Sequence, residues 1–128
     1  MTIHDLRLMG LAYLATPYSL YAAGLDKAFE DACAINARLA ERGITAFSPI
    51  AHSHPIAIHG RLNPKDGMFW IKHDELFMER CDLLIVAQLD GWEVSEGVTY
   101  EIDAFKEAGK PVYYLHPKTL DVQMEAKC

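Results

Sequence analysis

Two acidic side chains, those of Asp74 and Glu101, fall on otherwise apolar faces of segments with helical spacing. Residues three and four positions apart share one face of a helix. At those offsets Asp74 has only apolar neighbours: Trp70, Ile71, Phe77 and Met78. Glu101 has only apolar or small neighbours: Gly97, Val98, Ala104 and Phe105. The spacing therefore predicts two carboxylates on the core-facing sides of two helices, because the other helical acids that we compared each have a polar or charged neighbour.

A pair of inward-facing carboxylates is typical of one kind of chemistry. Burying a carboxylate is costly unless hydrogen bonds or a function compensate for it. Two carboxylates in one cleft are what enzymes use to cleave or transfer a glycosyl group. The alternative is that Asp74 and Glu101 each only accept a hydrogen bond from a nearby tyrosine or backbone amide at a helix edge. The spacing leaves both interpretations open.

Hydrophobic patterning predicts the elements that must position these carboxylates. Short apolar runs predict buried strands, and apolar residues at alternating steps of three and four predict helices that end near Gly. The expected strands are 8–16, 44–47, 83–87 and 112–115, and the expected helices are 25–42, 66–80 and 95–108. The segment 48–64, rich in His, Pro and Gly without a sustained period, is predicted to be a long loop.

The alternation of strands and helices predicts an α/β fold. Apolar strands that alternate with amphipathic helices form a parallel sheet covered on both faces and joined by right-handed crossovers. We therefore expect one domain, residues 1–128, built as a three-layer Rossmann-like or flavodoxin-like sandwich with a parallel sheet of four to five strands. Ligands bind beyond the carboxyl ends of such strands, so the loops 16–24, 48–64 and 88–95 should converge on one site.

The first and third of these loops carry side chains suited to binding. Tyr13, Tyr18 and Ser19 flank the end of the first strand and could orient a carboxylate or a sugar hydroxyl. The alternative for Tyr13 is a core aromatic with its hydroxyl at the edge of the sheet. Ser95 is placed to cap the last helix, and Gly97 would let a phosphate or a sugar hydroxyl approach its first-turn amides. An ordinary capped helix also explains Ser95 or Gly97 taken singly.

Three histidines in the second loop could form a metal site. His52 and His54 would lie on one side of an extended segment, followed by His59, and neutral imidazole is a common metal ligand. No Asp, Glu or Cys stands nearby to complete a ligand set. We therefore predict no metal and no other cofactor, and we expect His52 and His54 to line a polar ligand pocket.

Composition excludes several classes of function. Twelve basic and eighteen acidic side chains give a net charge of −6, the wrong sign for a general binder of nucleic-acid polymers or anionic membranes. Cys33, Cys81 and Cys128 fit neither a disulfide framework nor a zinc site. The apolar stretch 8–15 lacks the strongly basic segment that would precede it in a signal peptide, and no stretch could span a membrane. We expect a cytoplasmic protein whose partner is a small molecule.

Several short motifs follow one another along residues 13–115. They are Tyr13-Leu14-Ala15-Thr16-Pro17-Tyr18-Ser19, then Asp74, then Asp90-Gly91, then Ser95-x-Gly97-Val98-x-x-Glu101, and finally Gly109-Lys110-Pro111-Val112. In this order they resemble the nucleoside 2-deoxyribosyltransferase-like superfamily, and the segment 48–55 is similar to that of a small, functionally uncharacterised bacterial branch. The resemblance implies substrate binding by residues of the motifs: Thr16, Pro17, Tyr18, Ser19, Asp90, Gly91, Ser95 and Gly97.

The resemblance also implies a mechanism. The glutamate matching Glu101 attacks the anomeric carbon of a nucleoside or nucleotide and forms a glycosyl-enzyme ester. The aspartate matching Asp74 orients and protonates the leaving base, and the tyrosine matching Tyr13 holds the nucleophile. Water or a second base then resolves the ester with net retention. Because the related enzymes are oligomers, a homo-oligomer is expected.

Two departures from the pattern leave the substrate open. The nucleoside transferases of the superfamily carry an aspartate where this chain has Ser95, and serine there is typical of the branch that hydrolyses deoxynucleoside 5'-monophosphates. Those hydrolases also place an arginine in the first loop, whereas 16–24 contains no basic residue, although His52 or His54 could compensate. We expect cleavage of an N-glycosidic bond. The alternatives are a nucleotide-sensing module without catalysis and a metal-dependent hydrolase that uses His52, His54 and His59.

Overall fold

A computed structural model describes residues 1–124 of the chain, so Cys128 lies outside the described residues. The helices are α1 (Ile3–Leu6), α2 (Leu25–Glu41), α3 (Pro49–Gly60), α4 (Gly67–Arg80) and α5 (Glu96–Glu107), with a short 3-10 helix, η1 (Trp92–Val94). The strands are β1 (Ala12–Ala15), β2 (Ala46–Phe47), β3 (Leu83–Ala87), β4 (Val112–Leu115) and β5 (Val122–Gln123). Within the described residues, no helix combines the length and the apolar character needed to cross a bilayer.

The strands form one mixed sheet in the order β2-β1-β3-β4-β5. β1 is parallel to both β2 and β3, and β3 is parallel to β4. β5 pairs with β4 in the antiparallel direction, so the sheet is not wholly parallel as predicted. The turn before β5 is closed by His116, whose Nδ1 accepts hydrogen bonds from the backbone N–H groups of Lys118 and Thr119. The protein is thus an α/β fold with a five-stranded, mostly parallel sheet.

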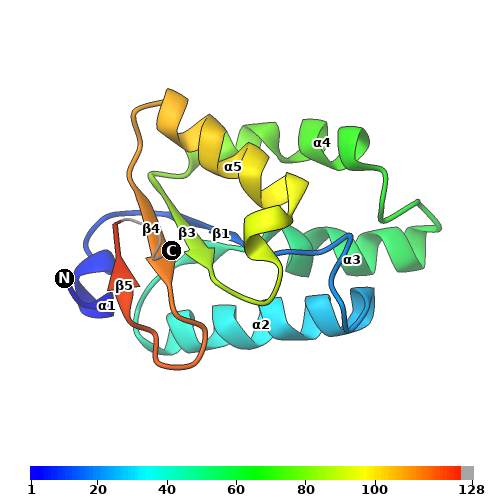
Figure 1. The fold of residues 1–128 in the computed structure, drawn as a ribbon. Coiled ribbons are helices and arrows are strands. Elements are labelled where there is room, and N and C mark those ends of the chain that lie inside the picture. The colour runs from blue at the N-terminus through cyan, green and yellow to red at the C-terminus, as the bar shows by residue number, and fades with distance from the viewer. Residues whose placement is uncertain (125–128) are drawn as a thin grey trace.

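Two hydrophobic cores lie on opposite faces of this sheet, because successive side chains of a strand alternate between the faces. Leu14 and its neighbours on one face pack with Leu39 of α2 and with α1. Tyr13 and its neighbours on the other face pack with Phe105 of α5 and with Met78 of α4. Figure 1 shows the same arrangement, with α2 on one side of the sheet and α4 and α5 on the other. Every residue of β1 and β3 is buried, which explains their continuous apolar runs.

The predicted bounds of several elements agree with the structure. β3 and β4 have the predicted bounds, and α4 and α5 follow the N-cap residues Asp66 and Ser95. β1 is shorter than predicted, because residues 7–9 form the turn that follows α1 and Gly10 adopts a positive φ two residues before the strand.

The predicted loop at 48–64 is wrong, because most of it forms α3. The helix begins after Ser48, whose Oγ accepts a hydrogen bond from the N–H of Ala51 at 3.1 Å. Pro49 occupies the first turn, where a missing N–H costs nothing, and Pro55 is accommodated inside the helix. A helix turns by about 100° per residue. His52 and His54 therefore face different directions, rather than one side of an extended segment.

Gly10, two residues before β1, stands where the structure leaves no room for a side chain. Its φ is +103°, and a Cβ there would overlap Oδ2 of Asp82, the atom that accepts a hydrogen bond from the N–H of Leu11 at 2.8 Å. Gly10→Ala should therefore lower the free energy of unfolding by about 2–4 kcal/mol, through backbone strain together with the overlap. Urea denaturation followed by circular dichroism would measure the loss.

Gly109→Ala is the matched control, because Gly109 also has a positive φ, +72°, but no atom lies within 4 Å of a Cβ built there. Strain alone should cost about 1 kcal/mol at that position. Equal losses in the two variants would show that the overlap with Asp82 does not matter.

Candidate functional site

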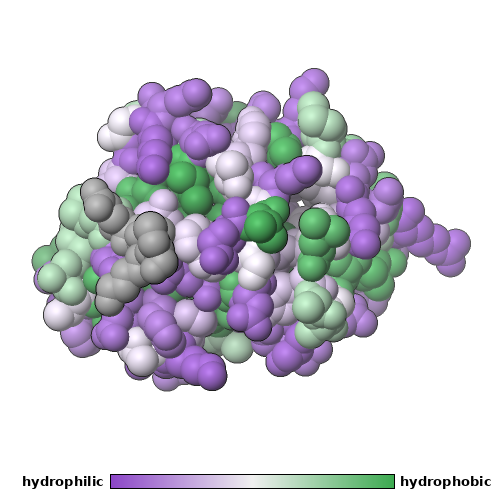
Figure 2. Space-filling view, in the orientation of Figure 1, coloured by the Kyte–Doolittle hydropathy of each residue, from purple (hydrophilic) through white to green (hydrophobic). Residues whose placement is uncertain are grey.

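A cavity of about 750 Å³ lies beyond the carboxyl ends of β1 and β3. Its walls come from the segments that follow these two strands and from α3, α4 and α5. This is the end of the sheet at which parallel strands place ligands. Exposed apolar side chains, those of Leu20, Met68 and Val94, lie among its lining residues. Apolar patches also interrupt the polar surface on the face shown in Figure 2.

The cavity brings together most of the residues that the sequence predicts for a site. Those that line it are Tyr13, Thr16, Pro17, Tyr18, Ser19, Asp74, Asp90, Gly91, Ser95, Gly97 and Glu101. His52 and His54 are not among the lining residues. The prediction that these two histidines line the pocket is therefore wrong, because α3 turns both of them toward other helices.

Asp74 and Glu101 approach the same cavity from α4 and α5, as the helical spacing predicts. Asp74 is only 7% exposed, and Glu101 is partly buried. Burial raises the pKa of Asp74 to about 7. Burial also raises the pKa of Glu101 to about 8, with a lowering contribution from Tyr13 and a raising contribution from the charge of Asp74. Near neutral pH, this pair of carboxyls can hold one proton and one negative charge.

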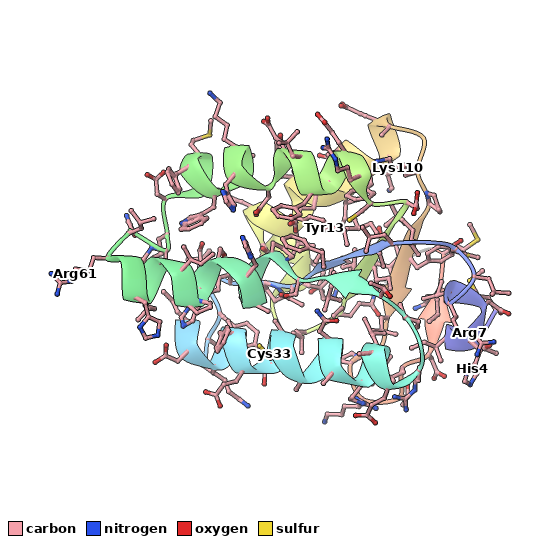
Figure 3. The ribbon with its side chains drawn as sticks, turned by 180° about the vertical axis from the view of Figure 1, so that it is seen from behind. His4, Arg7, Tyr13, Cys33, Arg61 and Lys110 are labelled. Atoms are coloured by element: carbon pink, nitrogen blue, oxygen red, sulfur yellow. The ribbon has the colours of Figure 1, made fainter. Side chains whose placement is uncertain are left out.

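The Tyr13 hydroxyl lies beside these two carboxyls, at the end of a fully buried side chain near the centre of the molecule (Figure 3). Burial is the main cause that raises the pKa of Tyr13 above its usual range, and the negative charges of Glu101 and Asp74 raise it further. Its contact with Glu101 influences both pKa values but falls outside hydrogen-bond geometry. Tyr13 therefore remains protonated, and its hydroxyl keeps a proton that a small movement would allow it to donate to an ionised Glu101.

Three buried polar atoms around the cavity have no hydrogen-bond partner among the described residues. They are the hydroxyls of Tyr13 and Thr16 and Oδ1 of Asp74. Buried polar atoms in proteins are nearly always hydrogen-bonded, and those that are not occur preferentially at functional sites. All three belong to lining residues, so the cavity presents three polar atoms that water or a polar ligand can meet.

Contacts at both ends of α4 hold Asp74 in place. At the start of the helix, Asp66 Oδ1 accepts a hydrogen bond from the N–H of Phe69 at 3.3 Å. At its end, the Lys110 ammonium donates to the carbonyls of Met78 and Glu79 at 3.0 and 2.8 Å, a favourable place for a cation. Lys110 lies at this end of α4 in Figure 3. The helix, and with it Asp74, is thereby tied to the start of β4.

The N-terminus of α5 forms another part of the wall. Ser95 Oγ accepts a hydrogen bond from the N–H of Val98 at 3.3 Å, which confirms the predicted cap. Gly97 has no atom closer than 4.0 Å to the place of a Cβ, so a ligand can approach the backbone there. Glu96, on the same turn, adds a negative charge at the rim.

His52 pairs with a histidine of α4 instead of facing the cavity. Its Nε2 lies 3.2 Å from Nε2 of His73, and both rings contact Phe77. Burial lowers the pKa of His52, and the charge of His73 lowers it further. Within residues 1–124, no group of three or more His, Cys, Asp and Glu side chains could hold a metal ion. His52, His54 and His59 are thus not gathered into such a group.

The sequence did not reveal several lining residues, among them Pro49, Ile50 and Ser53 of α3. Ser48 followed by Pro49 is a helix-start signal that could have placed α3. Lys65, which precedes α4, also lines the cavity, and it had no recognisable motif around it.

Comparison of the chain with models of known protein families identifies one match. No curated protein matches the chain significantly. Residues 10–116 match the model of the family described as Domain of unknown function (DUF1937). Because this match covers β1 to β4 and all of the residues that line the cavity, the chain belongs to the DUF1937 family.

Proposed function

We propose that the protein cleaves the N-glycosidic bond of a nucleoside, with Glu101 as the nucleophile and Asp74 as the acid. The observation that carries the proposal is the pair of carboxyls with raised pKa values on two walls of one cavity, next to a buried tyrosine hydroxyl. Glycosyl transfer with retention needs one ionised and one protonated carboxyl at the same time. The pair holds a single proton near neutral pH, and its pKa values of about 7 for Asp74 and about 8 for Glu101 place that proton more often on Glu101. The reactive form, with the proton on Asp74 and the charge on Glu101, therefore lies about 1.4 kcal/mol higher, and the substrate must favour it.

The reaction proceeds in two displacements. A carboxylate oxygen of Glu101 forms a bond to the anomeric carbon, the bond from that carbon to the base breaks, and Asp74 gives its proton to the departing nitrogen. Water then attacks the same carbon, the ester bond breaks, and Asp74 takes a proton from the water. Tyr13 stabilises the Glu101 carboxylate as a donor. If a second base replaces water, its N–H proton goes to Asp74, and the reaction is a transfer.

The charges around the cavity favour an uncharged nucleoside over a 5'-monophosphate. Its acidic lining residues are Asp74, Asp90, Glu96 and Glu101, and among the described lining residues Lys65 is the one cation. Proteins usually bind phosphate groups with arginine or lysine side chains and with helix N-termini. Here Glu96 stands on the first turn of α5, where its charge opposes a phosphate.

A substrate panel tests this proposal. Purified protein is incubated with 2'-deoxynucleosides, ribonucleosides and their 5'-monophosphates, with and without a second free base, and released bases are separated by chromatography. We expect 2'-deoxynucleosides or ribonucleosides to release base at least about tenfold faster than their monophosphates, because like charges repel in a partly buried site.

Other outcomes of the panel would contradict parts of the proposal. Faster release from monophosphates would show that the charge argument is wrong. If no base is released from any compound while a nucleoside raises the melting temperature, the cavity belongs to a non-catalytic sensing module.

The wider expectations from the sequence are part of the same proposal. A Rossmann-like or flavodoxin-like, three-layer architecture is supported by the order β2-β1-β3-β4, which agrees with the flavodoxin strand order, and by helices on both faces. A cytoplasmic location and a homo-oligomeric state complete the proposal. Size-exclusion chromatography with light scattering would determine the oligomeric state.

A further inference from the structure

A chain of hydrogen bonds leads from the surface of α2 to the wall of the cavity. Asp26 Oδ1 lies 3.1 Å from Nε2 of His54, and Nδ1 of His54 lies 2.6 Å from the hydroxyl of Tyr18. The Asp26 side chain is 89% exposed, whereas the His54 side chain is 6% exposed. Tyr18 lines the cavity. The proposed mechanism uses none of these three side chains.

The chemistry of the three groups fixes the direction of both hydrogen bonds. A carboxylate only accepts hydrogen bonds, and a neutral imidazole carries one N–H and one acceptor nitrogen. The N–H of His54 that faces Asp26 is therefore on Nε2. Nδ1 is then the acceptor, so the Tyr18 hydroxyl must donate its proton to His54. Burial and the charge of Asp26 raise the pKa of Tyr18, so this proton is retained.

Packing keeps the imidazole ring in this orientation. Phe29 of α2 stacks on His54 with ring centroids 4.7 Å apart and an interplanar angle of 22°. Tyr18 meets the same ring edge-on, with centroids 5.7 Å apart. His54 is thus held from two sides by aromatic rings and at both nitrogens by hydrogen bonds. A ring held in this way cannot rotate to offer its other nitrogen to Tyr18 without losing these contacts.

We infer that His54 is a positioning residue, oriented by Asp26, that makes the Tyr18 hydroxyl an acceptor toward the ligand. Because the only hydroxyl proton of Tyr18 is used by His54, its oxygen can only accept a further hydrogen bond. The group that Tyr18 recognises must then be a donor, such as a hydroxyl, and not a phosphate or carboxylate oxygen. The inference rests on the proposed function only where it identifies this donor as a sugar hydroxyl of a nucleoside.

The test compares three probes: 2'-deoxyadenosine, 2',3'-dideoxyadenosine and 2',5'-dideoxyadenosine. In the wild type, loss of one of the two sugar hydroxyls should raise KM by about tenfold, because a buried acceptor is left unpaired. Tyr18→Phe should lose this discrimination, and His54→Leu should weaken it, because the Tyr18 hydroxyl is then no longer fixed as an acceptor. In each variant kcat should change less than threefold, because neither side chain touches the anomeric carbon.

His54→Asn is the conservative variant, because its amide oxygen can take the place of Nδ1 and accept the Tyr18 proton. It should restore the tenfold discrimination. His59→Leu, a substitution of an exposed histidine on the same helix, is the matched control and should behave as the wild type. A merely structural effect of His54→Leu would lower activity on all probes equally. Unchanged discrimination in Tyr18→Phe, or equal behaviour of His54→Asn and His54→Leu, would overturn the inference.

A second measurement is independent of any ligand. Long-range ¹H–¹⁵N correlation spectra report which imidazole nitrogens carry a proton, and the His54 signals are assigned by their loss in His54→Asn. We expect a proton on Nε2 and none on Nδ1 at pH 7.5. A proton on Nδ1 overturns the inference, whatever the probes show. If the spectra agree but the wild type neither binds nor cleaves any probe, the proposed function fails, and the sugar contact fails with it.

Discussion

Replacing Glu101 by glutamine should reduce base release from the preferred nucleoside by at least about 10⁴-fold. The amide has nearly the size of the carboxyl but cannot form an ester with the anomeric carbon, so the first displacement is lost. Rates are measured by chromatography of the free base under single-turnover conditions. In the wild type, mass spectrometry of the acid-quenched reaction should also detect protein heavier by one glycosyl group, and Glu101→Gln should lack this species.

A control variant and a stability measurement show whether the loss of activity in Glu101→Gln is due to chemistry or to misfolding. Glu107→Gln, at the end of the same helix and outside the cavity lining, should retain wild-type activity. The melting temperature of Glu101→Gln at pH 8 should equal or exceed that of the wild type, because a partly buried carboxylate is replaced by a neutral group. Base release by Glu101→Gln at the wild-type rate would remove Glu101 from the mechanism and leave Asp74 as the remaining acidic candidate.

The free energy of unfolding should fall by on the order of 6 kcal/mol between pH 5 and pH 9 because of Asp74 and Glu101. Their pKa values in the folded protein are about 7 and about 8, above the usual values of 3.8 and 4.5 for these side chains in water. The folded state therefore binds their protons more tightly than the unfolded state does. This stabilisation is complete below about pH 4 and is lost as the pH rises through 7 and 8.

The double variant Asp74→Asn/Glu101→Gln isolates this effect, because amides do not titrate in that range. Urea denaturation of the wild type and the double variant at several pH values gives two curves of unfolding free energy. We expect the wild-type curve to fall more steeply between about pH 5 and pH 8 and to run parallel to that of the double variant above that range. Parallel curves would mean that the two carboxyls titrate as they would in water, and Glu107→Gln serves as the control for a surface carboxylate.

The elements that could be predicted from the sequence are those in which local pattern and tertiary environment agree. β3 is buried on both faces, so its five residues form one apolar run with clear ends. α5 has a serine cap that the structure retains and a regular apolar face. The same regularity allowed the inward positions of Asp74 and Glu101 to be predicted, because helical geometry links a residue to neighbours only three and four positions away.

What could not be predicted depends on contacts between distant segments. α3 contains Pro55, and its apolar residues do not gather on one helical face. The helix is held by packing against α2 and by the bonds of His54 to Tyr18 and Asp26. The pairing of His52 with His73 joins two consecutive helices through side chains that are 21 positions apart, beyond the reach of any helical period. β5 and α1 have two and four residues, too few for any periodicity to develop. Local pattern carries no information about these arrangements.

In residues 1–124, the sheet ends at both sides in a strand of only two residues, β2 and β5. An open strand edge offers unpaired backbone groups to which another polypeptide can add, and this is a common route to fibrous aggregates. Two residues provide very little backbone for such an addition, and β2 leads at once into the cap of α3. The long, strongly apolar strands β1 and β3 are enclosed in the middle of the sheet, so the segments most prone to self-association are shielded while the protein stays folded.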